Sequence, residues 1–244
     1  MSFGLGHGRD LDPGEWGMDQ KDLPPFDQGK WDPRRWFAHP ERRFELEIGS
    51  GKGTFLLQQS PLEPTTNFLG MEWTNEFYRY AADRLRRHQT ANARIMRANA
   101  VEFIRHWCPV GICSVIHLYF SDPWPKTRHH KRRVVQDQSL ADMHAALTPG
   151  GELRIVTDHV ELWAWYEEHA ARHAHLFDRS VFDRPTSAGS GEVVGTNFER
   201  KFRREGRPFH AMTLRRREPA ESVAHEASRI TSPAASQVPP TRAM

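Results

Sequence analysis

The sequence predicts an α/β fold: a doubly wound, mostly parallel, seven-stranded sheet with helices on both faces. Two observations support this fold. Short apolar stretches alternate with amphipathic stretches of helix length along the middle of the chain, as in repeated βα units. With 244 residues, 38% of them hydrophobic, the chain is long enough for one large domain plus flanking segments. In such a sheet, ligands bind at the carboxyl ends of the strands.

The first half of the domain contains three βα units. Strands are expected at residues 44–48, 67–71 and 94–96, and helices at residues 54–59, 75–88 and 101–107. The first helix begins directly after Gly53. The second has Thr74 or Asn75 as its cap, and its apolar residues recur every three or four positions.

The second half continues this alternation. Strands are expected at residues 114–120, 152–157 and 209–214, and helices at residues 134–147 and 160–173. The first of these strands is almost continuously apolar, which indicates a central strand buried on both faces. The Thr-Pro-Gly-Gly stretch at residues 148–151 predicts the end of a helix. The last strand alternates in polarity and is expected to run antiparallel to the others.

Residues 41–217 form the expected domain, and two segments flank it. Residues 1–40 are rich in Gly, Pro, Asp and Trp and show no sustained periodicity, which predicts an irregular arm docked by Trp16, Trp31 and Trp36. Residues 218–244 contain no Phe, Trp or Tyr and are rich in Ala, Ser and Pro. Such a segment cannot bury enough apolar surface to become ordered, so a disordered tail is expected.

The composition also bears on compartment and metal binding. Cys108 and Cys113 are too few for a disulfide framework and match no zinc pattern, so both are expected to be buried and reduced. No apolar run of about 18 residues and no signal-peptide core is present, which predicts a soluble, cytoplasmic protein with no membrane association. His169, His173 and His175 lie among alanines and acidic residues, which favours a solvated helix face, and no metal is expected.

Positive residues are clustered although the net charge is only +3. The clusters are residues 128–133, then Arg84, Arg86 and Arg87, and finally Arg200, Lys201, Arg203, Arg204 and Arg207. Phosphate binding depends on local potential rather than on total charge. One such cluster would indicate only a solvated face, but three beside one candidate site favour a polyanionic partner.

A glycine-rich loop follows the first strand and reads Glu47-Ile48-Gly49-Ser50-Gly51-Lys52-Gly53. Its spacing is neither the dinucleotide fingerprint Gly-x-Gly-x-x-Gly nor a Walker loop. Gly49 would let the backbone approach a ligand closely. The carboxylate of Glu47 would repel a pyrophosphate but attract an ammonium group. Taken alone, the loop suits a structural turn as well as a cofactor site.

Further polar groups follow the next two strands. Glu72 ends the second strand, where a carboxylate can accept hydrogen bonds from both hydroxyls of a ribose. Asn99 and Ala100 follow the third strand, where an amide can read an adenine edge. Together with Glu47, these groups suit an amino acid, a ribose and an adenine in order. S-adenosyl-L-methionine has all three parts, whereas NAD lacks the first. Each residue taken singly also suits a helix cap or a solvated position.

The fourth strand runs into Phe120-Ser121-Asp122-Pro123-Trp124-Pro125-Lys126. An acidic residue thus enters a rigid Pro/Trp turn, and the basic cluster at 128–133 follows directly. Asp122 stands where a sulfonium donor and its acceptor would meet. The aromatic group and the cations are suited to a nucleic acid, although a Pro-Trp turn is equally consistent with a purely structural role for the Trp.

Two later segments also carry candidate groups. Asp158 follows the fifth strand. Thr196, Asn197, Phe198 and Glu199 combine a hydroxyl, an amide, an aromatic ring and a carboxylate before a basic run. The carboxylate would suit the N1 and N2 hydrogens of a guanine, and the hydroxyl a ribose or base edge. The same pattern equally suits the capped start of an amphipathic helix.

The chain from residue 44 to residue 216 resembles the tRNA (guanine-N7)-methyltransferase family, which has the Rossmann-like class I methyltransferase fold. The glycine loop is similar to that of many class I methyltransferases. The stretch from Phe120 to Lys126, with the His/Lys/Arg run after it, is more specific. So is the stretch from Thr196 to Lys201, which is similar to the family's Thr-x-Phe/Tyr-Glu-x-Lys/Arg motif.

The resemblance implies roles for the candidate residues. Positions that bind the cofactor S-adenosyl-L-methionine are Glu47, Gly49, Glu72, Asn99, Ala100 and Asp122, and Asp122 is also the catalytic position. Positions that contact the substrate are Lys126, Asp158, Thr196, Asn197, Phe198 and Glu199. Asn99 stands where many family members have Asp, but either side chain can accept a hydrogen bond from the amino group of adenine.

The implied reaction is methylation of N7 of a guanine in the variable loop of tRNA. N7 carries an exposed lone pair and no proton, so the reaction needs no general base. Alignment of the reacting atoms and electrostatic stabilisation of the cationic ring are then the expected sources of catalysis.

Alternatives from two classes remain open at this point. Asp122-Pro123-Trp124 distantly resembles the Asp-Pro-Pro-aromatic loop of methyltransferases that act on an exocyclic base amino group, although here the second Pro follows the Trp. A non-catalytic RNA-binding protein on the same scaffold is the other alternative, and the intact glycine loop argues against it. A nicotinamide dehydrogenase is disfavoured by Glu47 and by the glycine spacing. No protein partner is evident from the sequence.

Overall fold

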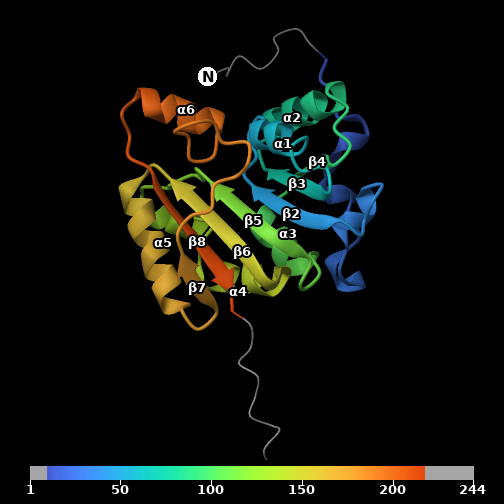
Figure 1. The fold of residues 1–244 in the computed structure, drawn as a ribbon. Helices are drawn as coiled ribbons and strands as arrows, with labels where there is room; N and C mark the ends of the chain where they lie inside the picture. The colour runs from blue at the N-terminus through green and yellow to red at the C-terminus, as the bar shows by residue number, and fades with distance from the viewer. Residues whose placement is uncertain (1–9, 218–244) are drawn as a thin grey trace, which may run out of the picture.

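A computed structural model describes residues 10–217, which form one eight-stranded sheet with helices on both faces (Figure 1). The strands are β1 (Gly17–Asp19), β2 (Arg43–Ile48), β3 (Thr66–Glu72), β4 (Ala93–Arg97), β5 (Cys113–Tyr119), β6 (Leu147–Thr157), β7 (Phe177–Ser180) and β8 (His210–Arg216). The α-helices are α1 (Thr54–Gln59), α2 (Asn75–Arg87), α3 (Ala100–His106), α4 (Asp137–Ala146), α5 (Val160–Arg172) and α6 (Asn197–Arg204). The 3-10 helices are η1 (Gly14–Trp16), η2 (Gln20–Asp22), η3 (Phe26–Gln28), η4 (Pro33–Trp36) and η5 (Thr127–Arg132).

The strand order is β1-β4-β3-β2-β5-β6-β8-β7. All pairings from β1 to β6 are parallel, and β8 runs antiparallel to both β6 and β7. These pairings confirm the mostly parallel, doubly wound sheet and the late antiparallel strand, but the sheet has eight strands rather than seven. In Figure 1 the arrowheads of β5 and β6 point towards the end of the molecule where α6 lies. The order reverses between β2 and β5, which makes their carboxyl ends the expected ligand site.

Two apolar clusters cover opposite faces of the sheet. The neighbouring residues Phe68 and Leu69 of β3 belong to different clusters, as expected because successive side chains of a strand point to opposite faces. One cluster contains residues of α3, α4 and α5, and the other contains residues of α1 and α2 together with Val194, just before α6. The sheet is therefore covered by helices on both sides, as predicted.

Two predicted boundaries around α4 differ from the structure. The helix begins at Asp137 rather than at residue 134, because Gln136 and Ser139 form a reciprocal capping box there. Strand β6 begins at Leu147, five residues earlier than predicted. Leu147 pairs with Cys113 and Glu152 pairs with Val115, so the Thr-Pro-Gly-Gly stretch forms a bulge within the strand rather than a turn before it.

The amino-terminal arm is more regular than expected, since it contains β1 and the 3-10 helices η1 to η4. The indole N–H of Trp16 donates to the Thr90 carbonyl at 2.7 Å, and that of Trp36 donates to the Glu15 carbonyl at 3.1 Å. Trp31 packs edge-on against Phe103. The arm thus lies along the β4 edge of the sheet. Residues 1–9 and the predicted disordered tail, residues 218–244, lie outside the described residues.

Both cysteines and His169 lie inside the protein. Cys108 and Cys113 are buried and are not joined in a disulfide. His169 is buried rather than solvated, because it packs on Trp165 and its Nδ1 bonds the Trp165 carbonyl at 2.8 Å. Among residues 10–217, no helix is long and apolar enough to cross a membrane, and no cluster of His, Cys, Asp and Glu has the makings of a metal site.

Candidate active site

The glycine loop turns sharply at the end of β2. The backbone N–H groups of Gly49 and Ser50 donate to the Met71 carbonyl at 2.8 and 2.9 Å, which ties the loop to the end of β3. Gly49 has a φ of 78°, and a Cβ there would point into open space. Positive φ favours glycine, and the missing side chain leaves the backbone accessible to a ligand.

Glu47 is a buried carboxyl group with an unused acceptor. Its side chain is 5% exposed, and among the described residues its Oε2 has no hydrogen-bond partner. Burial raises the pKa of Glu47 to about 7, and the nearby charge of Glu72 adds to the effect. A buried carboxylate is costly unless a donor or cation completes it. The residue therefore fits the ammonium group of an amino-acid moiety.

Glu72 braces the glycine loop from the end of β3. Its Oε2 accepts the Gly51 N–H at 2.8 Å, and its Oε1 accepts the Thr74 N–H at 2.7 Å. Each carboxylate oxygen can accept a second hydrogen bond, so a ribose can still bind there. The next residue, Trp73, is 67% exposed and was not predicted as a site residue.

Asn99 forms the cap of α3 at the end of β4. Its Oδ1 accepts the N–H groups of Val101 and Glu102, which is the helix-cap alternative considered from the sequence. Its own backbone N–H donates to Oε1 of Gln20. Gln20 belongs to the amino-terminal arm and was not predicted to lie near the site. Ala100 is the first residue of α3 and is buried. Asn99 thus has its oxygen in the cap, and its Nδ2 hydrogens take no part in that cap.

Asp122 lies exposed in the loop that follows β5. The loop contains two non-glycine residues with positive φ, Phe120 at 54° and Trp124 at 42°. Such conformations are strained and persist where surrounding contacts hold them. Phe120 is held edge-on by the rings of Phe202 and Phe209, at centroid distances of 5.8 and 5.7 Å. The backbone on both sides of Asp122 is therefore held in a defined conformation.

The same loop is strapped to α5. The hydroxyls of Ser121 and Tyr166 lie 2.7 Å apart. Arg133 donates from Nε to the Pro123 carbonyl at 2.9 Å and from a terminal nitrogen to Glu161 at 2.6 Å, and its side chain is 1% exposed. Arg133 is thus a structural residue and does not belong to the phosphate-binding surface predicted for residues 128–133. Lys126, at the start of this surface, is exposed.

Thr196 and Glu199 build the start of α6. The hydroxyl of Thr196 accepts the Glu199 N–H at 3.2 Å. The fully buried carboxylate of Glu199 accepts the backbone N–H groups of Val193, Val194 and Gly195 at 2.6, 2.8 and 2.9 Å, and also pairs with Arg203. Both oxygens are therefore engaged within the protein. These contacts are those expected of the capped start of an amphipathic helix, the second interpretation of this motif.

Helix α6 joins the glycine loop to the predicted substrate side. The Asn197 amide donates to the Thr54 hydroxyl at 2.8 Å, directly after the loop. Phe198 is 44% exposed, and its ring edge would lie 3.4 Å from a Cβ on Gly51. The structure thus brings the two motifs together although 143 residues separate Asn197 from Thr54.

Asp158, at the end of β6, is tied to the residues that follow α6. Its carboxylate pairs with Arg207 at 2.7 Å, and the guanidinium of Arg207 also lies over the ring of Phe202 at 4.3 Å. Glu47, Glu72, Asn99, Asp122 and Asp158 therefore all follow or end strands at the same edge of the sheet.

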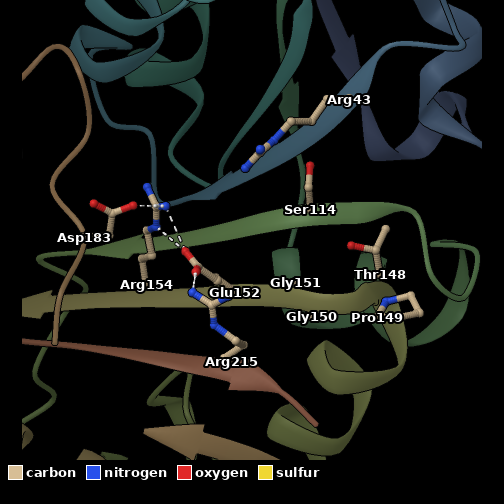
Figure 2. A pocket seen from close by; sticks show the side chains of 10 residues that line it. All are labelled: Arg43, Ser114, Thr148, Pro149, Gly150, Gly151, Glu152, Arg154, Asp183 and Arg215. Carbon is tan, nitrogen blue, oxygen red and sulfur yellow. Dashed lines mark hydrogen bonds and ion pairs between the residues drawn. The ribbon is translucent and has the colours of Figure 1, made fainter. Parts of the chain in front are cut away.

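A separate cavity of about 380 Å³ lies at the opposite, amino ends of the strands. Its lining includes Arg43 at the start of β2, Ser114 in β5 and the bulge of β6. Figure 2 shows Arg154 between Asp183 and Glu152, with which it forms ion pairs of 2.9 and 2.8 Å. Because these charges already have partners, and because the acidic strand ends lie elsewhere, this cavity is not the active site.

The Rossmann-like sheet, the glycine loop and the acidic strand ends define the chain as a class I methyltransferase. Residues 41–212 match the family model described as "Putative methyltransferase". The fold is similar to that of the 16S rRNA methyltransferase KamB, with a TM-score of 0.51 and 13% identity over 72% of this chain and 88% of that one. The aminoglycoside resistance methyltransferase NpmB1 gives a TM-score of 0.50 at 15% identity, over 72% and 87% of the two chains.

The chain belongs to the tRNA (guanine-N7)-methyltransferase family. It is 33% identical to the tRNA (guanine-N(7)-)-methyltransferase of Nitrobacter hamburgensis, over 88% of this chain and 86% of that protein. It is 36% identical to the enzyme of that name from Alkalilimnicola ehrlichii, over 71% and 72%. The relative in Enterococcus faecalis is 30% identical, over 77% and 86%. These relatives confirm the family predicted from the motifs.

Proposed function

We propose that this protein transfers a methyl group from S-adenosyl-L-methionine to N7 of a guanine in the variable loop of tRNA. The observation that carries the proposal is the buried Glu47 carboxylate, one oxygen of which has no hydrogen-bond partner within residues 10–217. Glu47 lies at the end of a strand that pairs directly with the strand leading to Asp122. This arrangement supports adjoining sites for a cationic amino-acid ligand and for an acceptor base.

Five residues would hold the cofactor, which supplies an electrophilic methyl group on a sulfonium when bound. Glu47 would accept the ammonium group, and Gly49 would leave room for the backbone to approach. Glu72 would accept the ribose hydroxyls. Asn99, together with the first backbone N–H of α3 at Ala100, would read the adenine edge, since early N–H groups of a helix have no partner within the helix.

Asp122 would act on the acceptor base through position and charge. N7 has no proton to lose, so Asp122 orients the guanine and offsets the positive charge that develops on its ring. The strained and strapped backbone around Asp122 supports this role, because a fixed carboxylate needs no reorganisation during the reaction.

The residues proposed for tRNA binding are of three kinds. Lys126, Asn197 and Phe198 are exposed and would contact the RNA directly. Thr196 and Glu199 would act indirectly by fixing the loop before α6. Asp158 would contact the substrate when Arg207 leaves it for a phosphate, which a polyanionic ligand favours.

The test is incubation of the protein with S-adenosyl-L-methionine labelled in the methyl group and an unmodified tRNA transcript, followed by mapping of the label. Label on N7 of a variable-loop guanine is the expected result. Label on an exocyclic amino group would instead favour the alternative methyltransferase. Absence of both label transfer and cofactor binding would contradict the proposal.

A further inference from the structure

We infer that Gln20 of the amino-terminal arm is a positioning residue for the adenine end of the cofactor site. The inference rests on the proposed function, because it concerns the residue proposed to read adenine, Asn99. Gln20 lies outside the part of the chain that matches the methyltransferase family model, residues 41–212.

Strand β1 delivers Gln20 to this place. It pairs in parallel with β4, and its last residue, Asp19, lies opposite Arg97. The two side chains also form an ion pair of 2.9 Å, which fixes the end of β1 against the end of β4. Because β1 and β4 are parallel, the residues that follow Asp19 and those that follow Arg97 leave the sheet at the same end. Gln20 therefore arrives beside Asn99, two residues after Arg97.

Gln20 replaces one half of a capping box. The spacing of Asn99 and Glu102 is that of a cap residue and its third helical residue, in which the Glu side chain usually accepts the N–H of the cap. Here Oε1 of Gln20 accepts the Asn99 N–H at 2.8 Å, and Nε2 of Gln20 donates to Glu102 at 3.3 Å. The amide of Gln20 is thus inserted between the two partners and bonds both.

This insertion links the arm to two parts of the proposed cofactor site. The backbone of Asn99 is held from outside by Gln20, while its Oδ1 holds the first turn of α3. The preceding residue, Ala98, donates its N–H to the Glu72 carbonyl at 3.2 Å, so the adenine and ribose positions share this backbone. Without Gln20, Glu102 is free to turn back to the cap, and the Asn99 backbone loses its external anchor.

The experiment compares Gln20→Ala with Gln28→Ala, an exposed glutamine of the same arm, by calorimetric binding of S-adenosylhomocysteine and of its inosine analogue. We expect Gln20→Ala to weaken S-adenosylhomocysteine binding by about 5- to 10-fold, as loss of one or two hydrogen bonds predicts. The preference for adenosine over inosine should narrow, because the Ala100 N–H, which directly follows the displaced Asn99, can donate to N1 of adenine but not to the protonated N1 of inosine. Turnover at saturating cofactor and tRNA affinity should stay near wild type, as should every property of Gln28→Ala.

A double variant, Gln20→Glu with Glu102→Gln, keeps an acceptor for the Asn99 N–H and restores the bond between side chains 20 and 102 with donor and acceptor exchanged. It should recover most of the affinity. Unchanged affinity and unchanged base preference in Gln20→Ala would overturn the inference alone. If Gln20→Ala weakens cofactor binding and tRNA binding by similar factors and also lowers the melting temperature, the inference is overturned too. Gln20 would then be a general stabilising residue. Failure of the wild-type protein to bind S-adenosylhomocysteine would overturn the proposed function as well.

Discussion

At the scale of single residues, Glu47 shows how burial prepares a group for its ligand. In water its carboxyl would be ionised at neutral pH, but burial brings its pKa to about 7. An ammonium ligand binds the carboxylate form. A ligand of this kind therefore competes with a proton at Glu47, and the competition falls in the physiological pH range.

This competition gives a pH-dependent prediction. Because the raised pKa leaves Glu47 protonated below pH 7, affinity for S-adenosylhomocysteine should fall by about tenfold for each pH unit below 7 and level off above it. Calorimetric titrations between about pH 5.5 and about pH 8 measure this slope. Glu47→Gln should bind weakly at every pH with a flat profile. If the affinity of Glu47→Gln depends equally steeply on pH, the proton that competes with the ligand binds to another group.

Asp122 carries the second residue-scale prediction. Asp122→Ala should lower turnover by about 100- to 1000-fold, the usual effect of removing one preorganised electrostatic group. The affinity for tRNA should change little, because the exposed cations remain. Single-turnover rates and filter binding measure the two quantities. Asp27→Ala, at an exposed position in the arm, is the matched control, and wild-type turnover in Asp122→Ala would remove this residue from the active site.

Glu199 predicts an effect on stability rather than on chemistry. Burial alone would raise its pKa, but hydrogen bonds from the Val194 and Val193 backbone and from Arg203 outweigh burial and lower it. Its contribution to stability is therefore present above the unfolded pKa of about 4.3 and is lost as pH falls through the lower folded value. Glu199→Gln should reduce the free energy of unfolding by about 1–3 kcal/mol at pH 7.

The same variant should approach wild-type stability as the pH falls from 7 through the lowered folded pKa of Glu199, where the wild-type carboxylate also becomes protonated. Urea unfolding above and below that pKa measures the difference. A deficit that is independent of pH would contradict a contribution from the charge, because Gln has nearly the same size as Glu and differs from it in charge and in one hydrogen-bond acceptor.

At the scale of elements, the loop after β5 separates two neighbouring arginines by role. Arg133 is buried and straps the loop to α5, whereas Arg132 is exposed and lies over the ring of Trp124 at 4.8 Å. Nothing in the sequence distinguishes the roles of these two adjacent arginines. The difference arises from Glu161, 28 residues further on, which accepts from Arg133.

The two arginines should therefore respond differently to substitution. Arg132→Ala should weaken tRNA binding and reduce the salt dependence of the binding constant by about one released counterion. Arg133→Ala should lower turnover and the melting temperature while leaving the salt slope nearly unchanged. Binding at several salt concentrations and single-turnover rates test the pair. Equal changes in salt slope would place both side chains on the RNA surface.

The elements also show what the sequence can predict. Helix α1 has its predicted bounds. The strands that carry Glu47 and Glu72, and the strand that leads to Asn99, were predicted because each has an apolar run followed by a polar end. Strands β1 and β7, of three and four residues, are too short for a periodic pattern and depend on partners far along the chain. The positions of Gln20 and Arg133 were missed for the same reason, since each is defined by a distant contact.

At the scale of the whole molecule, α6 connects the two halves of the proposed site. The bond between Asn197 and Thr54 joins the substrate-side helix to the helix that begins directly after the glycine loop. Ordering of one side by its ligand should therefore favour the ordered form of the other, which is positive thermodynamic coupling.

Coupling of this kind can be measured directly. S-adenosylhomocysteine should tighten tRNA binding by about fivefold or more in the wild-type protein. Asn197→Ala should reduce this factor towards one, because the bond to Thr54 is lost. Asn75→Ala, at the start of α2, is a matched control. Retention of full coupling in Asn197→Ala would show that another contact transmits it.

Strand β1 has a consequence for the behaviour of the protein in solution. It covers the outer side of β4, whose Ile95 and Met96 are buried and whose backbone would otherwise be an open, apolar sheet edge. Open edges of this kind invite pairing between molecules, whereas a three-residue strand beginning with glycine and ending in an acidic residue is a poor template. A shortened protein that begins after Asp19 should therefore self-associate and precipitate, even though every proposed catalytic group would still be present.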